Sequence, residues 1–300
     1  MSQSTNTLPR ITGLLVLEVR KSNPNGDPER ESSPRQRPDG KGEISPVSVK
    51  RKLRDLVLEK EGIVWQTIKT QLGITVDDEF QILENRGRDR ASIKKLLEEP
   101  GFPAFKRAYW DARLFGNTFL EEAGPDTIRA GVAHFGVGVS VAPIEIEFST
   151  WTSKSGVETG KDRGMAPMAF RVVKHGVYTV PFFVNPNLAH KTGCTELDVK
   201  LMLSLLSQTY KANLAVIRTM VEVVHAHVFT HKSPLGSVSD FALIDALTPK
   251  KMADPGKPSE SLADYKIPTW DDVKTQEVRK GATKKFTDCC AENGYRDYAI

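Results

Sequence analysis

Four basic residues, Lys50, Arg51, Lys52 and Arg54, lie within one short stretch of the chain. Cations at this density bind the phosphates of single-stranded nucleic acid, and the affinity of such binding falls as salt rises. The same four charges could also form an ordinary solvated helix face. Charge alone does not separate these two interpretations, so the elements around the cluster have to decide between them.

The sequence before the basic cluster contains a rigid turn. The hexapeptide N-P-N-G-D-P occupies 23–28 and directly follows the apolar run 11–19. Its prolines fix φ and cannot donate to a sheet ladder, whereas Asn25-Gly26 tolerates positive φ. We therefore expect a central strand to end sharply at Asn23. Because loops at strand ends can present N–H groups to phosphates, this turn favours the nucleic-acid interpretation of the basic cluster. A plain tight turn is the alternative.

A second candidate RNA site is the segment 161–175, which mixes cations with apolar side chains. A protruding hairpin of this composition can insert apolar side chains between bases while its cations hold the backbone. An ordinary surface hairpin or a dimer contact would have the same composition. The candidate RNA-binding residues here are Arg163, Met165, Met168, Phe170, Arg171 and Lys174.

Three histidines, His225, His227 and His231, are spaced to share one face of a strand over 221–231. Histidines on one face can ligate a metal ion. The sequence places no acidic residue in register with them, and apolar residues share the expected face, namely Val221, Val223 and Phe229. We therefore expect no metal site and no cofactor. His231 and Lys232, at the end of the strand, are expected to reach RNA phosphate instead.

The pattern of elements around these residues predicts an α+β fold. Ser45 and Pro46 are a typical N-cap and first helical residue, and apolar positions from Val49 to Val57 continue one helical stripe that Gly62 ends. Further helices are expected within 63–102, over about 103–122 and from Thr195, and strands within 128–148, 170–184 and 221–231. This order of strand, helix, strands, helix and strand is that of a ferredoxin-like, RNA-recognition-type core.

Bulk properties exclude several classes of protein. The chain has 300 residues, a formal net charge of +4 and 39% hydrophobic residues, which are values for a globular protein with an ample core. No apolar run approaches the roughly 18–20 residues that span a bilayer, and the N-terminus lacks a signal-peptide pattern. Three cysteines in no metal or disulfide spacing indicate reduced thiols, so we expect a cytoplasmic protein. No nucleophile elbow, P-loop or H-E-x-x-H motif occurs, and we expect no enzyme.

Taken together, these segments resemble the repeated backbone subunit of type I CRISPR surveillance complexes (Cascade) in the RAMP superfamily, and in particular its Csd/Csh-type branch. The residues that carry the resemblance are N-P-N-G-D-P at 23–28, S-V-K-R-K-L-R at 48–54, Y-W-D-A-R-L-F-G at 109–116, H-G-V-Y at 175–178, H-K-S-P-L-G at 231–236 and L-A-D-Y at 262–265. Two segments depart from the family. Where the family usually has Gly-Pro-Val-Gln, this chain has G-V-A-H at 131–134, so the role of the glutamine would pass to His134. Where the family commonly has Gly-Arg-Lys, this chain has A-F-R at 169–171.

The resemblance implies a single RAMP-type domain over 1–300. Its parts would be an RRM-like palm (10–62, 103–149 and 181–247), a helical finger insertion (63–102), a thumb β-hairpin (150–180) and a C-terminal wrapping segment (248–300). Copies would stack along one guide RNA (crRNA), and each thumb would displace a base at regular intervals while the other bases pair with target DNA. The implied phosphate ligands are Lys50, Arg51, Lys52 and Arg54, and Asn23 and Asn25 would shape the RNA-binding loop beside them. Adjacent copies, other Cascade subunits and an effector nuclease are the implied partners.

The same superfamily implies an alternative function, that of an endoribonuclease with a loop aspartate. Asp27 or Asp39 would then act with Mg²⁺ support. Asp27 is more simply a turn former, and Asp39 lies in a Pro-Asp-Gly turn.

Overall fold

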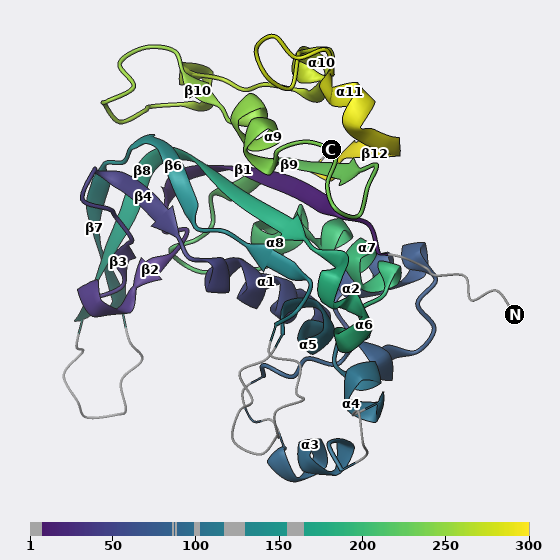
Figure 1. Ribbon diagram of the computed structural model, residues 1–300. Helices are drawn as coiled ribbons and strands as arrows, with labels where there is room; N and C mark the ends of the chain where they lie inside the picture. Colours follow the sequence, from purple (N-terminus) through teal and green to yellow (C-terminus); the bar gives the residue numbers. More distant parts are fainter. Residues whose placement is uncertain are drawn as a thin grey trace, which may run out of the picture.

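A large antiparallel sheet forms the middle layer of the protein, with helices below it and the C-terminal part of the chain above it (Figure 1). The computed structural model describes residues 8–85, 87, 89–98, 103–116, 130–154 and 165–299. Within these ranges no helix is long and apolar enough to cross a membrane.

The order of the strands along the sheet is β12-β9-β1-β8-β6-β4, and β5 and β7 also pair with β8. Every one of these pairs is antiparallel. The strands are β1 (Ile11–Ser22), β4 (Lys41–Ile44), β5 (Ala133–Phe135), β6 (Gly138–Pro143), β7 (Ile146–Lys154), β8 (Met165–Val184), β9 (Val221–His231) and β12 (Cys290–Asp297). Residues 11–19 are all buried because β1 lies between β8 and β9 with both its faces covered, which confirms the predicted central strand.

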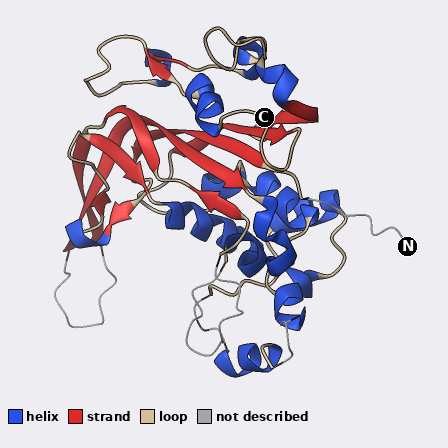
Figure 2. Ribbon diagram, viewed as in Figure 1, coloured by secondary structure: helices blue, strands red, loops and turns tan. Residues whose placement is uncertain are grey.

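The helices below the sheet cover its larger hydrophobic core (Figure 2). Ser45 caps α1 through a hydrogen bond from the Ser48 N–H to Ser45 Oγ (3.3 Å), and Pro46 is the first helical residue, as the sequence predicts. The other elements below the sheet are α2 (Ile63–Leu72), η2 (Asp77–Phe80), α3 (Arg90–Leu96), α4 (Pro103–Ala108), α5 (Trp110–Phe115), η3 (Pro186–Leu188), α6 (Ala189–Thr192), α7 (Glu196–Leu205) and α8 (Gln208–Lys211). Helices α3 and α4 bury a small separate core with Leu83. Helix α1 (Pro46–Leu58) ends before Gly62, which caps α2.

The predicted continuous helix from 103 is wrong. Tyr109 has an extended backbone (φ −104°, ψ 100°) and separates α4 from α5. A bridge between Gln81 and Tyr109, in which the Trp110 N–H donates to the Gln81 carbonyl at 3.1 Å, draws the chain out of helical geometry there. A contact 28 residues away in sequence thus overrides the local helical pattern.

The upper layer is built by the chain from 240 onward. Its elements are α9 (Asp240–Leu247), β10 (Lys250–Lys251), η4 (Leu262–Asp264), β11 (Tyr265–Lys266), α10 (Trp270–Val273) and α11 (Phe286–Cys289). They bury a second core against the upper face of the sheet, which includes Leu14, Phe229 and Leu243. The C-terminal segment does more than wrap the surface, because its last strand, β12, joins the sheet beside β9.

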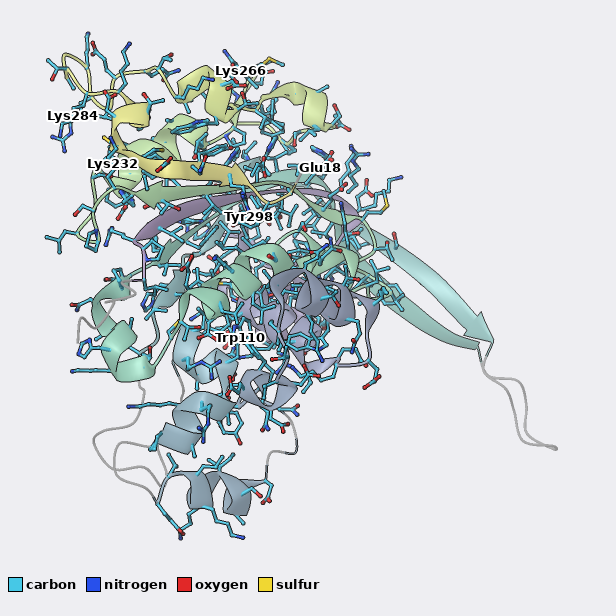
Figure 3. The ribbon with its side chains drawn as sticks, turned by 90° about the vertical axis from the view of Figure 1, so that its right-hand side faces the viewer. Glu18, Trp110, Lys232, Lys266, Lys284 and Tyr298 are labelled. Carbon is cyan, nitrogen blue, oxygen red and sulfur yellow. The ribbon has the colours of Figure 1, made fainter. Side chains whose placement is uncertain are left out.

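Strands β7 and β8 form a hairpin that projects from the body of the protein (Figure 3). Their pairing runs from Ile146 opposite Val173 to Lys154 opposite Met165. Strand β8 has 20 residues and continues through the sheet to Val184, so the projecting hairpin is a direct extension of a sheet strand. The short strands β2 (Gly26–Asp27) and β3 (Ser33–Pro34), with η1 (Pro28–Arg30) between them, form a separate hairpin.

A bulge in the pairing of β1 with β9 changes which side chains of β9 share a face. The register shifts at Val16 and Leu17, which pair with His225 and Val223. Val221 and Val223 consequently face the lower core with Ala226, whereas Phe229 faces the upper core. The predicted common face of these valines with the histidines is wrong, because one extra residue in a strand inverts the alternation beyond it.

Candidate nucleic-acid interface

The turn after β1 is fastened to the start of α1. The side-chain carbonyl of Asn25 accepts from the Ser45 backbone N–H at 2.7 Å, and the backbone carbonyl of Asn25 accepts from the Arg35 N–H at 3.1 Å. Asn23 is buried, and its side-chain amide donates to the Ser32 carbonyl at 2.7 Å. Both asparagines therefore determine the shape of the turn, as predicted for the loop, while their predicted RNA contacts stay predictions.

The loop 212–220 packs against the same turn. The Asn23 N–H donates to the Ile217 carbonyl at 2.6 Å, and Arg218 Nε donates to the Asn23 carbonyl at 3.4 Å. The Asn213 side-chain amide donates to the carbonyl of Lys52 at 3.1 Å. Arg218 is a cation of this junction that the sequence reasoning missed. Its signal was weak, since it is a lone arginine between a predicted helix and a predicted strand.

Lys52 does not lie on an open basic face. Its side chain is 4% exposed, its ammonium donates to Ser48 Oγ at 2.8 Å, and it lies 4.5 Å from the centre of the Tyr210 ring. Burial lowers the pKa of Lys52 to about 7, and the positive charge of Arg218 adds to this effect. Lys52 is therefore not an accessible cation, as a phosphate ligand on the surface of α1 would have to be.

Arg54 is also buried, with 8% of the residue exposed. Its Nε donates to Asp111 Oδ2 at 2.8 Å. The fully buried Asp111 also accepts from the N–H groups of Leu83 (2.7 Å) and Glu84 (3.1 Å). This ion pair joins α1 to α5 and to the segment after η2. Arg54, like Lys52, is therefore engaged inside the protein and does not lie on an open basic face.

The two remaining cations of α1 are more accessible. Arg51 pairs with Asp55 one turn later and donates from Nη1 to the Glu84 carbonyl at 2.6 Å. Lys50 lies 5.4 Å from the centre of the Phe115 ring and has no ion pair within the described part of the chain. Its pKa is lowered by burial and by the charge of Arg54. Lys50 thus combines partial exposure with the lack of an ion pair in the described part of the chain.

His134, on β5, lies near Lys50. The pKa of His134 is lowered by its partial enclosure and then by the Lys50 ammonium. Contacts between α1 and β5 bring these two residues together, although 84 positions separate them in sequence. Two predicted RNA-binding residues from different segments therefore share one locality.

The base of the projecting hairpin is tied to the β2–β3 loop. Arg171 forms an ion pair with Glu31 at 2.6 Å, donates to Ser33 Oγ at 3.1 Å, and lies 5.2 Å from the centre of the Phe148 ring. Phe148 is 73% exposed. The hairpin thus presents an arginine and an aromatic ring side by side, a combination that suits single-stranded nucleic acid.

The other predicted hairpin residues are placed as follows. Lys174 pairs with Glu145 (3.4 Å) and Glu260 (3.1 Å), so two carboxylates face its charge. Arg163 lies outside the described residues, and for Met165 and Met168 the backbone alone, in β8, is described. Phe170 lies within the hairpin, on β8 opposite Ser149 of β7.

His231 and Lys232 are not brought together with α1. His231 is buried at the end of β9, hydrogen-bonded through Nε2 to Thr12 Oγ1 (2.9 Å) and through Nδ1 to the Ser237 N–H (3.0 Å). Lys232 lies level with the upper layer, whereas Trp110 of α5 lies on the other side of the sheet (Figure 3). Asn23 follows the opposite end of β1, roughly 35 Å away at the usual rise per strand residue.

The two aspartates of the alternative nuclease hypothesis stabilise turns. Asp27 Oδ1 accepts from the Glu29 N–H at 3.2 Å and lies 3.6 Å from Arg35 Nη2. Asp39 Oδ1 accepts from the Lys41 N–H at 3.1 Å and lies 3.7 Å from Arg37 Nε. Each carboxylate has a partner of its own that accounts for its position.

The large antiparallel sheet and the helices packed on it define an α+β protein. Residues 9–269 match the family of CRISPR-associated protein Cas7, and the chain belongs to that family. A curated relative, CRISPR-associated protein Cas7 of Haloferax volcanii, is 28% identical over an alignment of 224 residues that covers 65% of this chain. The chain spans 62% of the length of that relative.

Solved structures to which this chain shows similarity include two chains from CRISPR RNA-guided surveillance complexes. One, from a complex described as pre-nicking, has a TM-score of 0.44 at 15% identity and covers 74% of this chain and 78% of its own. The other has a TM-score of 0.43 at 17% identity, with 74% and 69% covered. A chain of a Type III-B Cmr-beta complex bound to cognate target RNA has a TM-score of 0.38 at 11% identity, with 75% and 62% covered.

Proposed function

We propose that this protein binds crRNA as the repeated backbone subunit of a CRISPR surveillance complex. The observation that carries the proposal is the match of residues 9–269 to the Cas7 family. The protein would read the phosphate backbone and the shape of the guide, while base pairing reads sequence. Its partners would be crRNA, target DNA, adjacent copies of the same chain, other subunits of the complex and an effector nuclease.

The proposed architecture is a ferredoxin-like, RRM-like palm. Strand β1 connects through α1 to β6, and β8 connects through α7 to β9, so two strand–helix–strand units interleave in the order β9-β1-β8-β6. This order supports the palm, over 10–62, 103–149 and 181–247. The elements α2 and α3 within 63–102 would be the finger, the β7–β8 hairpin over 150–180 the thumb, and 248–300 the C-terminal wrapping segment.

The proposed crRNA site has two parts. Lys50 and His134 would meet the phosphate backbone beside α1, with Arg51 at its edge, and the turn held by Asn23 and Asn25 would fix their position. At the thumb, Arg171 would hold a phosphate while Phe148 stacks on a base. Lys52 and Arg54 would act indirectly, by fixing α1, because both are buried.

The scaffold role is proposed to be non-catalytic. Asp27 and Asp39, the candidates for a loop aspartate, both cap turns and lie near arginines. A carboxylate engaged in this way has fewer free oxygens for Mg²⁺, which supports a role in holding the loop.

The test is direct RNA binding by purified full-length protein, measured by fluorescence anisotropy with a labelled crRNA-length RNA of arbitrary sequence. We expect binding with weak sequence preference. The slope of the logarithm of the binding constant against the logarithm of the salt concentration should become shallower by about 0.7 for each phosphate contact that is removed. Lys50→Ala should weaken binding about tenfold, whereas the control Lys200→Ala, on the exposed side of α7, should not. Absence of binding at low salt would overturn the proposal.

A further inference from the structure

The structure brings two histidines and an aspartate together on the upper face of the sheet. His225 and His227 lie on β9, and Asp297 is the register partner of His227 on β12. One ligand atom from each residue lies within 4.8 Å of the other two. We propose that His225, His227 and Asp297 bind a divalent transition-metal ion of the zinc class. The site is separate from the proposed crRNA site and does not depend on the proposed function.

Asp297 is held in place as a ligand. Its Oδ1 accepts from the backbone N–H groups of Ala226 (2.8 Å) and Ala299 (3.0 Å). These bonds fix the carboxylate and leave Oδ2 to face His225 Nδ1, at 2.6 Å. Carboxylates that ligate metal ions are commonly oriented in this way by outer hydrogen bonds.

His227 supplies the second, independent observation. The residue is 1% exposed, and its Nε2 has no hydrogen-bond partner among the described residues. A buried polar atom without a partner costs about 1–3 kcal/mol, so it calls for an explanation. His227 Nδ1 is hydrogen-bonded to the Tyr295 hydroxyl at 2.7 Å, and Tyr295 stacks on Trp270 with ring centres 4.5 Å apart. With Nδ1 engaged, the lone pair of Nε2 can serve a metal ion.

The ligand types select the class of metal. Two imidazole nitrogens and one carboxylate oxygen suit Zn²⁺, Co²⁺ or Ni²⁺, whereas Mg²⁺ and Ca²⁺ require oxygen ligands. The rings of His225 and His227 are stacked 5.0 Å apart at an angle of 7°. Ligands of a tetrahedral zinc lie about 3.4 Å apart, so a small tilt of the more exposed His225 would close the site. Its side chain is 19% exposed, which leaves a way in for the ion and a place for a water ligand.

The proposed site differs from the three-histidine set that the sequence analysis considered and rejected. His231 does not take part, because Thr12 and Ser237 occupy both of its ring nitrogens. Asp297 takes part instead, from a strand 66 residues further along the chain. A metal ion here would join β12 to β9 and so fasten the C-terminal segment to the sheet, which is a structural role.

The experiment uses full-length protein with a histidine-free purification tag, first stripped with EDTA and then titrated with Zn²⁺ or Co²⁺ alone. We expect one equivalent of zinc by elemental analysis after desalting, a rise in Tm of several degrees, and visible Co²⁺ absorption of a four-coordinate site. His225→Gln and Asp297→Asn should each weaken zinc binding at least tenfold. His190→Gln, at an exposed histidine of α6, is the matched control and should bind like wild type.

Two results would overturn the proposal. One is less than 0.2 equivalents of zinc retained by folded wild-type protein, and the other is retention by both variants equal to that of the control. Should Asp297→Asn fail to fold, His225→Gln decides the question, because His225 is partly exposed and its replacement leaves the backbone contacts of Asp297 in place.

Discussion

Asn25 Oδ1 accepts a hydrogen bond from the backbone N–H of Ser45 at 2.7 Å. Ser45 is the N-cap of α1, so a residue in the turn after β1 directly fixes the first turn of the helix that carries Lys50. The chain between these two residues, 26–44, contains β2, β3 and β4. The turn and the helix therefore move as one unit, and disturbing either should disturb the placement of the cations.

Replacing Asn25 by alanine tests this coupling. The substitution leaves the Ser45 N–H without its acceptor, and we expect a loss of about 1–2 kcal/mol in the free energy of unfolding. RNA affinity should fall more than stability alone explains, because Lys50 loses its fixed position. Urea unfolding and RNA anisotropy measure the two effects. Asn187→Ala, at an exposed asparagine, is the control, and equal behaviour of the two variants would contradict the coupling.

Lys52→Met should stabilise the protein at neutral pH. The native pKa of Lys52 is about 7, below the unfolded value of 10.5, so below pH 7 both states are protonated and the buried charge imposes its full cost. Between pH 7 and 10.5 the unfolded state binds more protons, and wild-type stability rises with pH. The Tyr210 ring recovers part of the cost. We expect a gain of about 2 kcal/mol at pH 6.5 that shrinks towards pH 10. A gain independent of pH would contradict the assignment.

The sequence predicted those parts of the fold that local pattern determines. The buried run 11–19 and the Ser45-Pro46 cap lie where expected, since apolar continuity and capping act over a few residues. The burial of Lys52 and Arg54 could not be predicted in this way, because they meet Tyr210 and Asp111, partners that no local pattern reveals. The faces of β9 were misassigned beyond its bulge for the same reason, as long-range pairing decides where an irregularity falls.

The Arg54–Asp111 pair should behave as a buried ion pair. Arg54→Met leaves the Asp111 carboxylate uncompensated, so we expect a loss of about 3–5 kcal/mol in the free energy of unfolding. The double variant Arg54→Met with Asp111→Leu should lose less than the sum of the single variants, although the Leu83 N–H then lacks its acceptor. A double-variant cycle by urea unfolding measures the coupling. Additive losses would show that the pair does not act as a unit.

Asp27→Ala should not change whether the protein cleaves RNA, because we expect no cleavage by wild type either. If Asp27 caps η1 and faces Arg35, its removal costs about 1 kcal/mol of stability and alters no chemistry. Labelled RNA incubated with wild type, Asp27→Ala or Asp39→Ala in Mg²⁺ should stay intact on a denaturing gel, as it does in EDTA. Cleavage by wild type in Mg²⁺ that Asp27→Ala abolishes would establish the nuclease alternative instead.

Arg171 and Glu31 form an ion pair at the base of the hairpin. Replacing each of them in turn distinguishes a structural role of this base from a role in RNA binding. Glu31 is an exposed residue, and a pair of this kind contributes about 0–1 kcal/mol, so neither Arg171→Ala nor Glu31→Ala should change stability much. The two substitutions should affect RNA affinity differently. Arg171→Ala removes a phosphate ligand and should weaken binding several-fold, whereas Glu31→Ala frees the guanidinium and should leave binding equal or tighter. Equal weakening by both substitutions in an anisotropy titration would mean that the pair merely holds the hairpin in place.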